Sequence, residues 1–287
     1  MSNFNNLHKI KINQNIKLSD WFYSTYPNCS KTWLYKMLRQ KDIKVNGTKI
    51  KNDCILKEND EVEFFCAESI LQGQNVKIQI VYQDDFIICA FKGRGLEVEG
   101  EYSLTSILIN QTGLNLYPVH RIDRNTIGLV LFAKNESVLN ALIKATKSGE
   151  IEKRYLAWVY GKPDKEQDDC SCFIKVDKEN AFSSMSNLYL PGYQKVQTSY
   201  KVIKTIGNKS LLQCVIHSGK THQIRAHLAF LGYPILGDKK YSTNKINDMF
   251  KFNYQQLFAY QIVFNLKNEK LKYLNNVELK VSDADFM

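Results

Sequence analysis

Residues 120–134 read His120-Arg121-Ile122-Asp123-Arg124-Asn125-Thr126-Ile127-Gly128-Leu129-Val130-Leu131-Phe132-Ala133-Lys134. A polar loop with two arginines here enters an apolar strand, and Asp123 lies between Arg121 and Arg124. An opposite charge within ~4 to 6 Å favours the charged form of a carboxylate, so we expect Asp123 to stay ionised. The residues alone allow two interpretations: an ion pair that caps a loop, or a charged group at a site of chemistry.

A second stretch, residues 217–238, combines basic and imidazole side chains with a helical pattern. It reads HSGKTHQIRAHLAFLGYPILGD. The spacing predicts an amphipathic helix from Thr221, with His222 and Arg225 on one of its faces. Lys220 lies near the start of this helix, where backbone N–H groups favour phosphate, although a solvated surface lysine fits the pattern equally well.

The three histidines of this stretch raise the question of a metal site. His217, His222 and His227 are spaced five residues apart, which puts successive side chains about 140° apart around a helix, and no obvious thiolate ligand is nearby. Gly93-Arg94-Gly95 lacks the third glycine and the strand–helix frame of a dinucleotide-binding fingerprint. We therefore expect neither a metal ion nor a nucleotide cofactor.

The chain as a whole is basic, with 39 Lys and Arg against 29 Asp and Glu and a formal net charge of +10 over 287 residues. This excess suggests a polyanionic partner, because Lys and Arg that neutralise phosphates supply most sequence-independent nucleic-acid affinity. A generally basic surface would give the same total. No apolar segment suits a signal peptide or a membrane span, and the seven cysteines include no C-x-x-C pair. We expect a monomeric, cytoplasmic protein with reduced thiols and no membrane contact.

The basic excess is concentrated between residues 31 and 51, where seven Lys and Arg stand against Asp42 alone. Ser30 can cap a helix whose apolar positions recur at helical spacing, which leaves its cations free to face solvent. Asn46-Gly47 then predicts a tight hairpin over residues 43–50, because both turn positions need positive φ. The cations that we assign to the polyanionic partner here are Lys36, Arg39, Lys41 and Lys44.

Helices and strands alternate through the rest of the chain. Asn135 can cap a helix that Gly149 ends, and apolar runs predict strands over residues 153–160 and 211–216. Residues 66–76 lose periodicity and include Gly73 among polar residues, so we place a linker there.

Several of these stretches match motifs of known families. HRIDRNTIGLVLFAK resembles the H-R-L-D-R/K-x-T-S-G-L-L-x-F-A-K motif of RluA-type pseudouridine synthases, and GKTHQIRAHLAFLGYPILGD resembles their G-R-T-H-Q-I-R-x-H-x-x-x-x-G-x-P-I-x-G-D motif. Residues 152–159 are similar to the family's K-x-Y-x-A-x-V strand. The helices and hairpin of the N-terminal region resemble the S4 RNA-binding domain. The chain departs from the family at Gly93-Arg94-Gly95, where a proline loop is usual, at Ile127, where Ser is usual, and at Lys220, where Arg is usual.

The resemblance implies an α+β fold of two parts. An S4-like RNA-binding domain would cover residues 1–65, a linker residues 66–76, and a catalytic domain residues 77–287, with a mixed, largely antiparallel sheet and a central RNA-binding cleft. The implied activity is the isomerisation of specific uridines to pseudouridine, without a cofactor. Large-subunit ribosomal RNA is the preferred substrate, and transfer RNA stays open.

The resemblance also implies roles for individual residues. Asp123 would be the essential carboxylate, by attack on the sugar, attack on the base or removal of a sugar proton, and Arg225 would pair with it. Tyr155 would stack on the uracil and is a candidate for transfer of the C5 proton, while Arg121 would fill the space that the flipped base leaves. His120, Lys220 and His222 would contact the RNA. A non-catalytic RNA-binding assembly protein or chaperone on the same fold is the alternative, and pure binding would not need this catalytic set.

Overall fold

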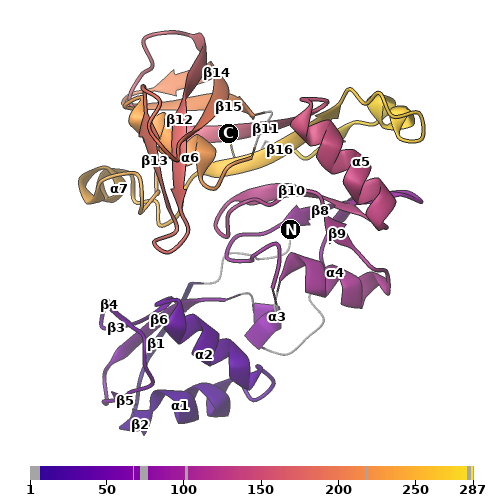
Figure 1. Ribbon diagram of the computed structural model, residues 1–287. Coiled ribbons are helices and arrows are strands. Elements are labelled where there is room, and N and C mark those ends of the chain that lie inside the picture. The colour runs from indigo at the N-terminus through magenta and orange to yellow at the C-terminus, as the bar shows by residue number, and fades with distance from the viewer. Residues whose placement is uncertain are drawn as a thin grey trace.

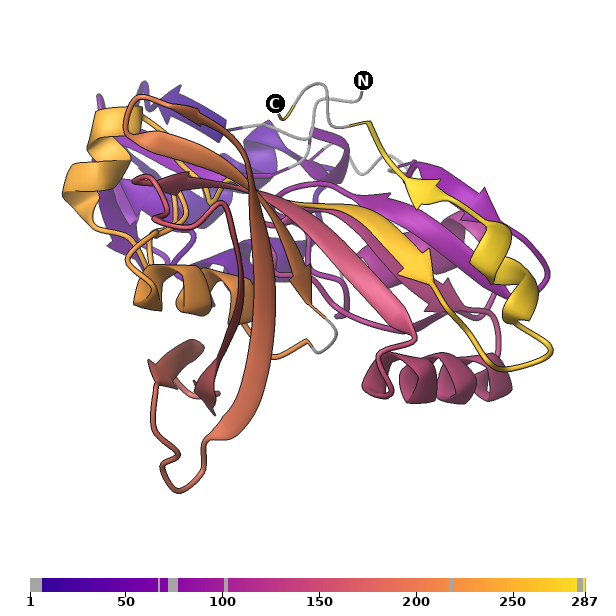
Figure 2. The same cartoon turned by 90° about the horizontal axis from the view of Figure 1, so that it is seen from above.

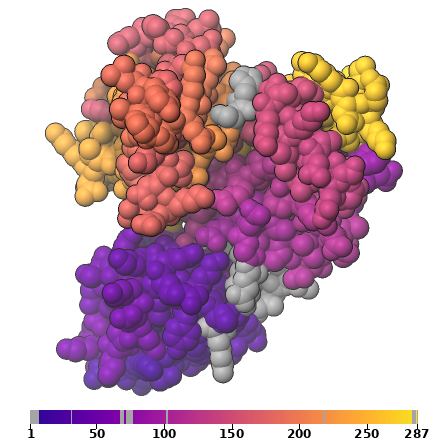
Figure 3. Space-filling model, in the orientation of Figure 1, coloured from indigo at the N-terminus to yellow at the C-terminus, as the bar shows by residue number. Residues whose placement is uncertain are grey.

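The computed structural model describes residues 7–66, 68–71, 77–100, 103–216, 219–282 and 286. They fold into two units, each with its own sheet (Figure 1). Residues 7–66 and 68–71 form an N-terminal unit, and the described residues from 77 onward form a C-terminal unit. The N-terminal unit lies directly against the C-terminal unit (Figure 3).

The N-terminal unit packs helices against a small antiparallel sheet. The sheet has the order β1-β6-β3-β4, and β2 pairs with β5 beside it. Phe22, Leu34, Ile43 and Phe64 are among the side chains of its core. The strands are β1 Leu7–Lys11, β2 Ile16–Lys17, β3 Ile43–Val45, β4 Thr48–Ile50, β5 Ile55–Leu56 and β6 Glu61–Phe65, and the helices are α1 Leu18–Thr25, α2 Lys31–Arg39 and α3 Glu68–Leu71.

Two local predictions in this unit are confirmed. The side chain of Ser30 accepts a hydrogen bond from the backbone N–H of Thr32 and so caps α2. Asn46 and Gly47 have φ values of 51° and 76°, so the β3–β4 hairpin turns where the sequence places it. Part of the stretch expected to be a linker has structure, because α3 lies within it and Leu71 is buried in the N-terminal core. Residues 67 and 72–76 of that stretch lie outside the described residues.

The C-terminal unit is built on an eleven-stranded mixed sheet. Its main path runs β13-β12-β14-β15-β11-β16-β10-β8-β7, with β17 on β16 and β9 on β10. Among the described strand pairs only β10 and β16 run parallel. The strands are β7 Ile80–Gln83, β8 Ile87–Lys92, β9 Tyr117–Pro118, β10 Ile127–Ala133, β11 Ile151–Tyr160, β12 Gln167–Asp177, β13 Phe182–Ser186, β14 Gln194–Ile206, β15 Lys209–Ile216, β16 Leu257–Phe264 and β17 Leu279–Lys280.

Helices cover both faces of this sheet. Helices α4 (Leu104–Thr112) and α6 (Gln223–Phe230) pack into one apolar cluster, and α5 (Glu136–Lys147) packs into another on the opposite face. Strand β10 contributes Val130 and Phe132 to the first cluster and Leu129, Leu131 and Ala133 to the second, as the alternation of a strand requires. The apolar run after the Asp123 loop is therefore a central strand that is buried on both faces. It gives that loop a rigid support.

The ends of the C-terminal unit carry smaller elements. Helix α7 (Asn244–Phe250) and the 3-10 helix η1 (Lys272–Asn276) follow α6 in the chain. Strands β12, β13 and β14 form an antiparallel arm at one end of the sheet (Figure 2), and α6 packs against β13 and β14. Within the described ranges, no helix has both the length and the apolar character that a membrane crossing needs.

Gly128 joins the Asp123 loop to β10 at a point of close backbone approach. Its φ is +124°, and a Cβ atom built there would lie 2.1 Å from the carbonyl oxygen of Ala259 on β16. Only glycine satisfies both the conformation and the contact. Gly128 is the second residue of β10, so this close approach falls within the short parallel pairing of Ile127 and Gly128 with Phe258 and Ala259.

Candidate active site

Asp123 lies on the loop between β9 and β10. A turn closes the loop, because the backbone N–H of Thr126 donates to the carbonyl of Asp123 at 2.9 Å. The Thr126 hydroxyl in turn accepts a hydrogen bond from the side chain of Gln255 at 2.7 Å in the interior. The Asp123 side chain keeps 24% of its surface exposed. The carboxylate is therefore held by a supported turn and still open to a ligand.

Arg225 connects Asp123 to a second, fully buried carboxylate. Its Nη1 donates to Asp123 Oδ2 at 2.8 Å. Its Nε and Nη2 donate to the two oxygens of Asp238 at 2.6 and 2.9 Å, in the planar fork geometry that arginine provides. The Asp238 side chain has no exposed surface, and that of Arg225 has 7%. Arg225 is thus fixed from behind by Asp238 and presents one remaining edge to Asp123.

The sequence around α6 explains how Arg225 is placed. Ile224 and Leu228 pack into the core, which leaves Arg225 to turn toward the Asp123 loop. The side chain of Gln223 donates to the carbonyl of Gln197 on β14 at 2.9 Å, so the first turn of the helix is tied to the sheet. The backbone N–H groups of Lys240 and Tyr241 donate to Asp238 at 2.9 and 3.2 Å.

The charges of this cluster stabilise one another. Burial by itself would raise the pKa of Asp238, but the hydrogen bonds and charge of Arg225 bring that pKa below its ordinary value. Burial opposes the charge on Arg225, and the two carboxylates outweigh it and raise the guanidinium pKa. Arg225 and Asp238 therefore form a charged pair in the interior, and Arg225 shares its remaining edge with Asp123.

Tyr155 lies on β11, which pairs with β16 next to β10. Its side chain is buried, and burial raises its pKa, with the charge of Asp123 adding to the effect. The phenol is therefore a neutral hydroxyl close enough to Asp123 to sense its charge. A carboxylate, an arginine and a tyrosine from three separate parts of the sequence thus meet at one place.

The profile of the family described as RNA pseudouridylate synthase matches residues 87–230, which include the whole Asp123 loop, Tyr155 and Arg225. The chain belongs to this family. It is an isomerase of the pseudouridine synthase type.

Proteins named as pseudouridine synthases are similar to this chain along most of its length. The chain is 31% identical over 274 residues to a ribosomal large subunit pseudouridine synthase C of Rickettsia bellii, across 88% of this chain and 90% of the relative. It is also 31% identical to an uncharacterized RNA pseudouridine synthase of Mycoplasma capricolum, across 93% of each chain. The solved structure titled Human RNA Pseudouridylate Synthase Domain Containing 1 has the same fold, with a TM-score of 0.62 at 20% identity over 74% of this chain and 85% of that one.

The remaining residues predicted for this synthase's site differ in how freely they can meet a ligand. The Arg121 side chain is 68% exposed, and its nearest described acid is Glu99 at 3.8 Å. Lys220 is exposed as well. His222 shares a hydrogen bond of 3.0 Å with the hydroxyl of Tyr241, and burial lowers the pKa of this histidine to about 4.

Two details of the α6 region correct the sequence-based expectations. The helix begins at Gln223 and not at Thr221, because His222 adopts a left-handed conformation with a φ of 56°. His222 therefore precedes the helix and does not share a helical face with Arg225. His217 lies outside the described residues, which contain no group of three side chains suited to hold a metal ion.

His120 occupies the half-buried start of the loop. Its Nε2 accepts a hydrogen bond from the backbone N–H of Leu131 at 3.2 Å. Burial lowers the pKa of His120 to about 3, and the charge of Lys153 contributes in the same direction. His120 is therefore a neutral imidazole engaged with β10.

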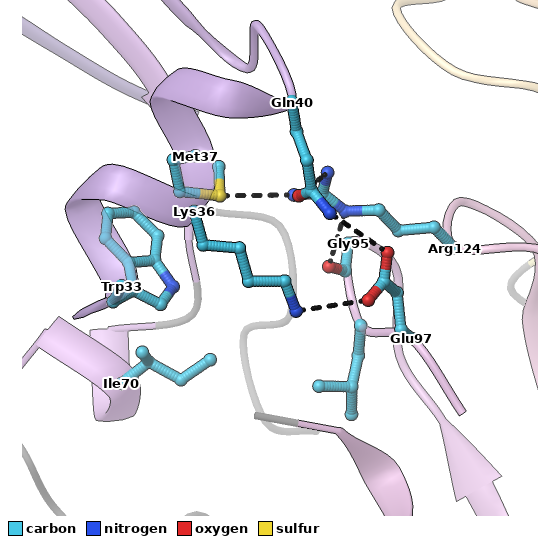
Figure 4. Close-up of a pocket in the computed structure, with 9 residues that line it drawn as sticks. Trp33, Lys36, Met37, Gln40, Ile70, Gly95, Glu97 and Arg124 are labelled. Carbon is cyan, nitrogen blue, oxygen red and sulfur yellow. Dashed lines mark hydrogen bonds and ion pairs between the residues drawn. The ribbon is translucent and has the colours of Figure 1, made fainter. Parts of the chain in front are cut away.

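The four cations predicted in the N-terminal unit fall into two groups. Arg39 and Lys41 are exposed. Lys44 donates to Glu63 within the N-terminal unit. Lys36 donates to Glu97 of the C-terminal unit at 3.1 Å (Figure 4). Half of the expected binding face of α2 and the hairpin is thus engaged in ion pairs.

Sequence reasoning missed two buried groups of this synthase. Asp238 ends the motif that carries Arg225, and its place there was the available signal. Lys92 has no exposed surface, and its ammonium donates to the carbonyls of Gly93, Leu96 and Arg124 at 2.8 to 2.9 Å. Burial lowers the pKa of Lys92 to about 7, while the charge of Asp123 acts in the opposite direction. Nothing in the local sequence distinguishes Lys92 from a surface lysine.

Proposed function

We propose that this synthase isomerises specific uridines of large-subunit ribosomal RNA, with Asp123 as its essential carboxylate. The observation that carries the proposal is the Asp123–Arg225–Asp238 triad, in which a partly exposed carboxylate is paired with a buried, doubly anchored arginine. The Rickettsia relative, named for the large ribosomal subunit, supports the choice of RNA.

The reaction rearranges the nucleoside without adding or removing atoms. The N1–C1′ bond breaks, the uracil turns, a C5–C1′ bond forms, and the proton on C5 moves away while N1 gains one. Asp123 acts at the sugar or the base, and Arg225 holds it in position and compensates its charge in a site where water is scarce. The pairing is compatible with attack on C1′, attack on the base and removal of a sugar proton alike.

Tyr155 completes the proposed catalytic set. Its buried ring offers a face on which the uracil can stack, and its raised pKa keeps the hydroxyl protonated at neutral pH. A neutral phenol can accept the C5 proton only while it gives up its own, so we assign Tyr155 to stacking and to relay of that proton.

The target base has to leave its stack before it can reach Asp123, at a cost of a few kcal/mol. We assign Arg121 to the space that the base vacates, since its side chain is exposed and only weakly engaged. Lys220 and His222 precede Arg225 in the chain, and we assign them to the RNA backbone near the flipped nucleotide. His120 supports the loop from behind and acts on the substrate only through it.

We assign the N-terminal unit to RNA binding as an S4-like domain. Arg39, Lys41 and Lys49 are exposed. Lys239, the residue that follows Asp238, is exposed as well. Partial burial lowers its pKa, and the positive charges of Lys44 and Lys49 on the β3–β4 hairpin act in the same direction. A basic surface thus continues from the hairpin toward the triad. Such a surface suits an RNA that contacts both units and enters a cleft at Asp123.

Mapping of pseudouridines in a strain without this gene tests the proposal. We expect one or a few pseudouridines to disappear from large-subunit ribosomal RNA, to return with the wild-type gene, and to stay absent with Asp123→Asn. Asp85→Asn, a change of an exposed carboxylate in the turn between β7 and β8, is the matched control and should restore them. Losses confined to transfer RNA would contradict the proposed substrate. Restoration by Asp123→Asn would contradict the proposed site.

A further inference from the structure

The side chain of Arg124, the residue after Asp123, reaches across to the N-terminal unit. It contacts the segment that ends α2. Its Nη1 donates to Gln40 Oε1, and its Nη2 lies 3.5 Å from the sulfur of Met37 (Figure 4). Its Nη1 also donates to the Asp42 carboxylate. Its Nε donates to the carbonyl of Gly95 at 3.0 Å. The Arg124 side chain is 25% exposed and that of Asp42 30%. One arginine thus joins the Asp123 loop to a separate folding unit.

The main chain of Arg124 is held as firmly as its side chain. Its carbonyl accepts hydrogen bonds from Lys92 Nζ at 2.9 Å and from the backbone N–H of Gly95 at 3.0 Å. Lys92 is fully buried, so this anchor belongs to the core of the C-terminal unit. The peptide next to Asp123 is therefore fixed from the core on one side and from the N-terminal unit on the other.

A second contact ties the same two surfaces together. Lys36 Nζ and Gln40 Nε2 donate to the two carboxylate oxygens of Glu97 at 3.1 and 3.4 Å. Glu97 follows Gly95 on the loop that Arg124 also bonds. The end of α2 therefore engages both loops that support Asp123, and the contact with Arg124 is part of a continuous interface.

The charge of Asp42 is out of place in an RNA-binding surface. It is the sole acidic residue among residues 31–51, which otherwise carry seven cations. A carboxylate there weakens attraction to phosphate. The ion pair with Arg124 gives Asp42 a structural role that RNA binding does not explain.

We propose that Asp42 is a positioning residue of the synthase reaction. Through Arg124 it holds the loop in the arrangement in which Asp123 meets Arg225, so that the docked N-terminal unit sets the rate of the chemical step as well as RNA affinity. This inference rests on the proposed catalytic role of Asp123. Without Asp42, the Arg124 guanidinium loses its carboxylate partner and keeps only its contacts with Gly95, Gln40 and Met37, so the outer anchor of the loop is weakened.

The directions in which kcat and Kd change separate a positioning role of Asp42 from a purely electrostatic effect on RNA binding. Removal of a negative charge from a basic surface should leave the affinity for RNA unchanged or make it tighter. Loss of the anchor should lower kcat, because small misplacements of catalytic groups cost up to about 100-fold in rate. We expect kcat to fall about tenfold for Asp42→Asn, which keeps a neutral hydrogen bond, and further for Asp42→Ala, while Kd does not weaken.

The experiment measures kcat, the single-turnover rate and Kd with the full-length protein and an in vitro transcript of large-subunit ribosomal RNA. Glu61→Gln is the matched control, because Glu61 is a surface carboxylate of the same unit that pairs with Lys9 at 3.6 Å. It should keep the wild-type rate. In a double-mutant cycle, Asp42→Ala should add no further loss to Arg124→Met, because both remove one interaction.

Asp123→Asn, assayed in parallel, separates failure of the positioning role from failure of the proposed function. An inactive Asp123→Asn with wild-type kcat in both Asp42 variants would overturn the positioning role and leave the proposed function intact. Additive losses in the double mutant, or an equal loss of kcat in Glu61→Gln, would overturn it too. An active Asp123→Asn would remove the proposed function itself. Because Asp42→Asn preserves size and hydrogen bonding, a folding defect confined to Asp42→Ala does not block the test.

Discussion

Arg121 and Arg124 flank the same aspartate and have opposite environments. Arg121 is 68% exposed, and Glu99, its nearest described acid, is 3.8 Å away. Arg124 is 25% exposed and uses its side chain to contact Gly95, Gln40, Asp42 and Met37. One side of the loop is thus left open to a ligand and the other is committed to the N-terminal unit. Position beside a proposed catalytic carboxylate therefore does not by itself indicate contact with a ligand.

The largest expected effect comes from removing Arg225, the residue that pairs with Asp123 between the two arginines. Arg225→Met leaves Asp238 buried and unpaired, so we expect a stability loss of about 3 to 5 kcal/mol together with loss of nearly all activity. Denaturant unfolding and single-turnover assays measure the two effects.

Asp238→Asn in the Arg225→Met background is the control for this change. It removes the stranded charge, so it should return part of the stability and none of the activity. A stable, active Arg225→Met protein would show that the triad is dispensable.

A smaller effect separates free cations from paired ones in the N-terminal unit. Arg39→Gln with Lys41→Gln should weaken RNA binding and reduce the slope of log affinity against log salt by up to roughly 1 for each phosphate that is no longer neutralised. Lys36→Gln should leave that slope unchanged, because Lys36 pairs with Glu97. Affinities at several salt concentrations decide the matter. Equal slopes for all three proteins would mean that Arg39 and Lys41 do not meet phosphate.

An effect on stability alone, without a role in binding RNA, concerns His120 at the half-buried start of the loop. An unfolded histidine titrates near ~6.5, whereas burial lowers the pKa of folded His120 to about 3. Between these values the unfolded state binds more protons, so stability falls as pH decreases through this window. The wild-type protein should therefore lose more stability than His120→Asn from pH ~6.5 to ~3. Parallel curves from denaturant unfolding would show that His120 does not titrate as its burial implies.

Local sequence patterns were sufficient for the secondary structure around the site. The apolar run after Asp123 is strand β10, Asn135 caps α5 by accepting from Val138, and the Asn46-Gly47 turn is present. Each of these three features follows from a rule that depends only on residues close together in the sequence. The pairing of Arg225 with Asp123 came from the family motif and has the expected geometry.

The contacts that sequence could not supply are long-range. Asp42 and Arg124 are 82 positions apart, and no local pattern indicates that Asp42 pairs with Arg124 and not with a cation near it in the sequence. The start of α6 is set by the left-handed backbone of His222 and its bond to Tyr241, which helix propensity does not anticipate. Lys92 reads as an ordinary lysine until its three carbonyl partners are known.

The difference in role that we propose for Arg121 and Arg124 can be measured with one variant of each residue. Arg121→Ala and Arg124→Met are compared on two RNAs that present the same uridine, stacked in a stem in one and unstacked in the other. An arginine that fills the vacated space offsets an unstacking cost, so Arg121→Ala should lose much more activity on the stacked target. Arg124→Met should lose the same factor on both, because it acts on the enzyme's own loop. Equal Arg121→Ala defects on the two RNAs, shrinking together as salt rises, would contradict the account and make Arg121 a phosphate contact.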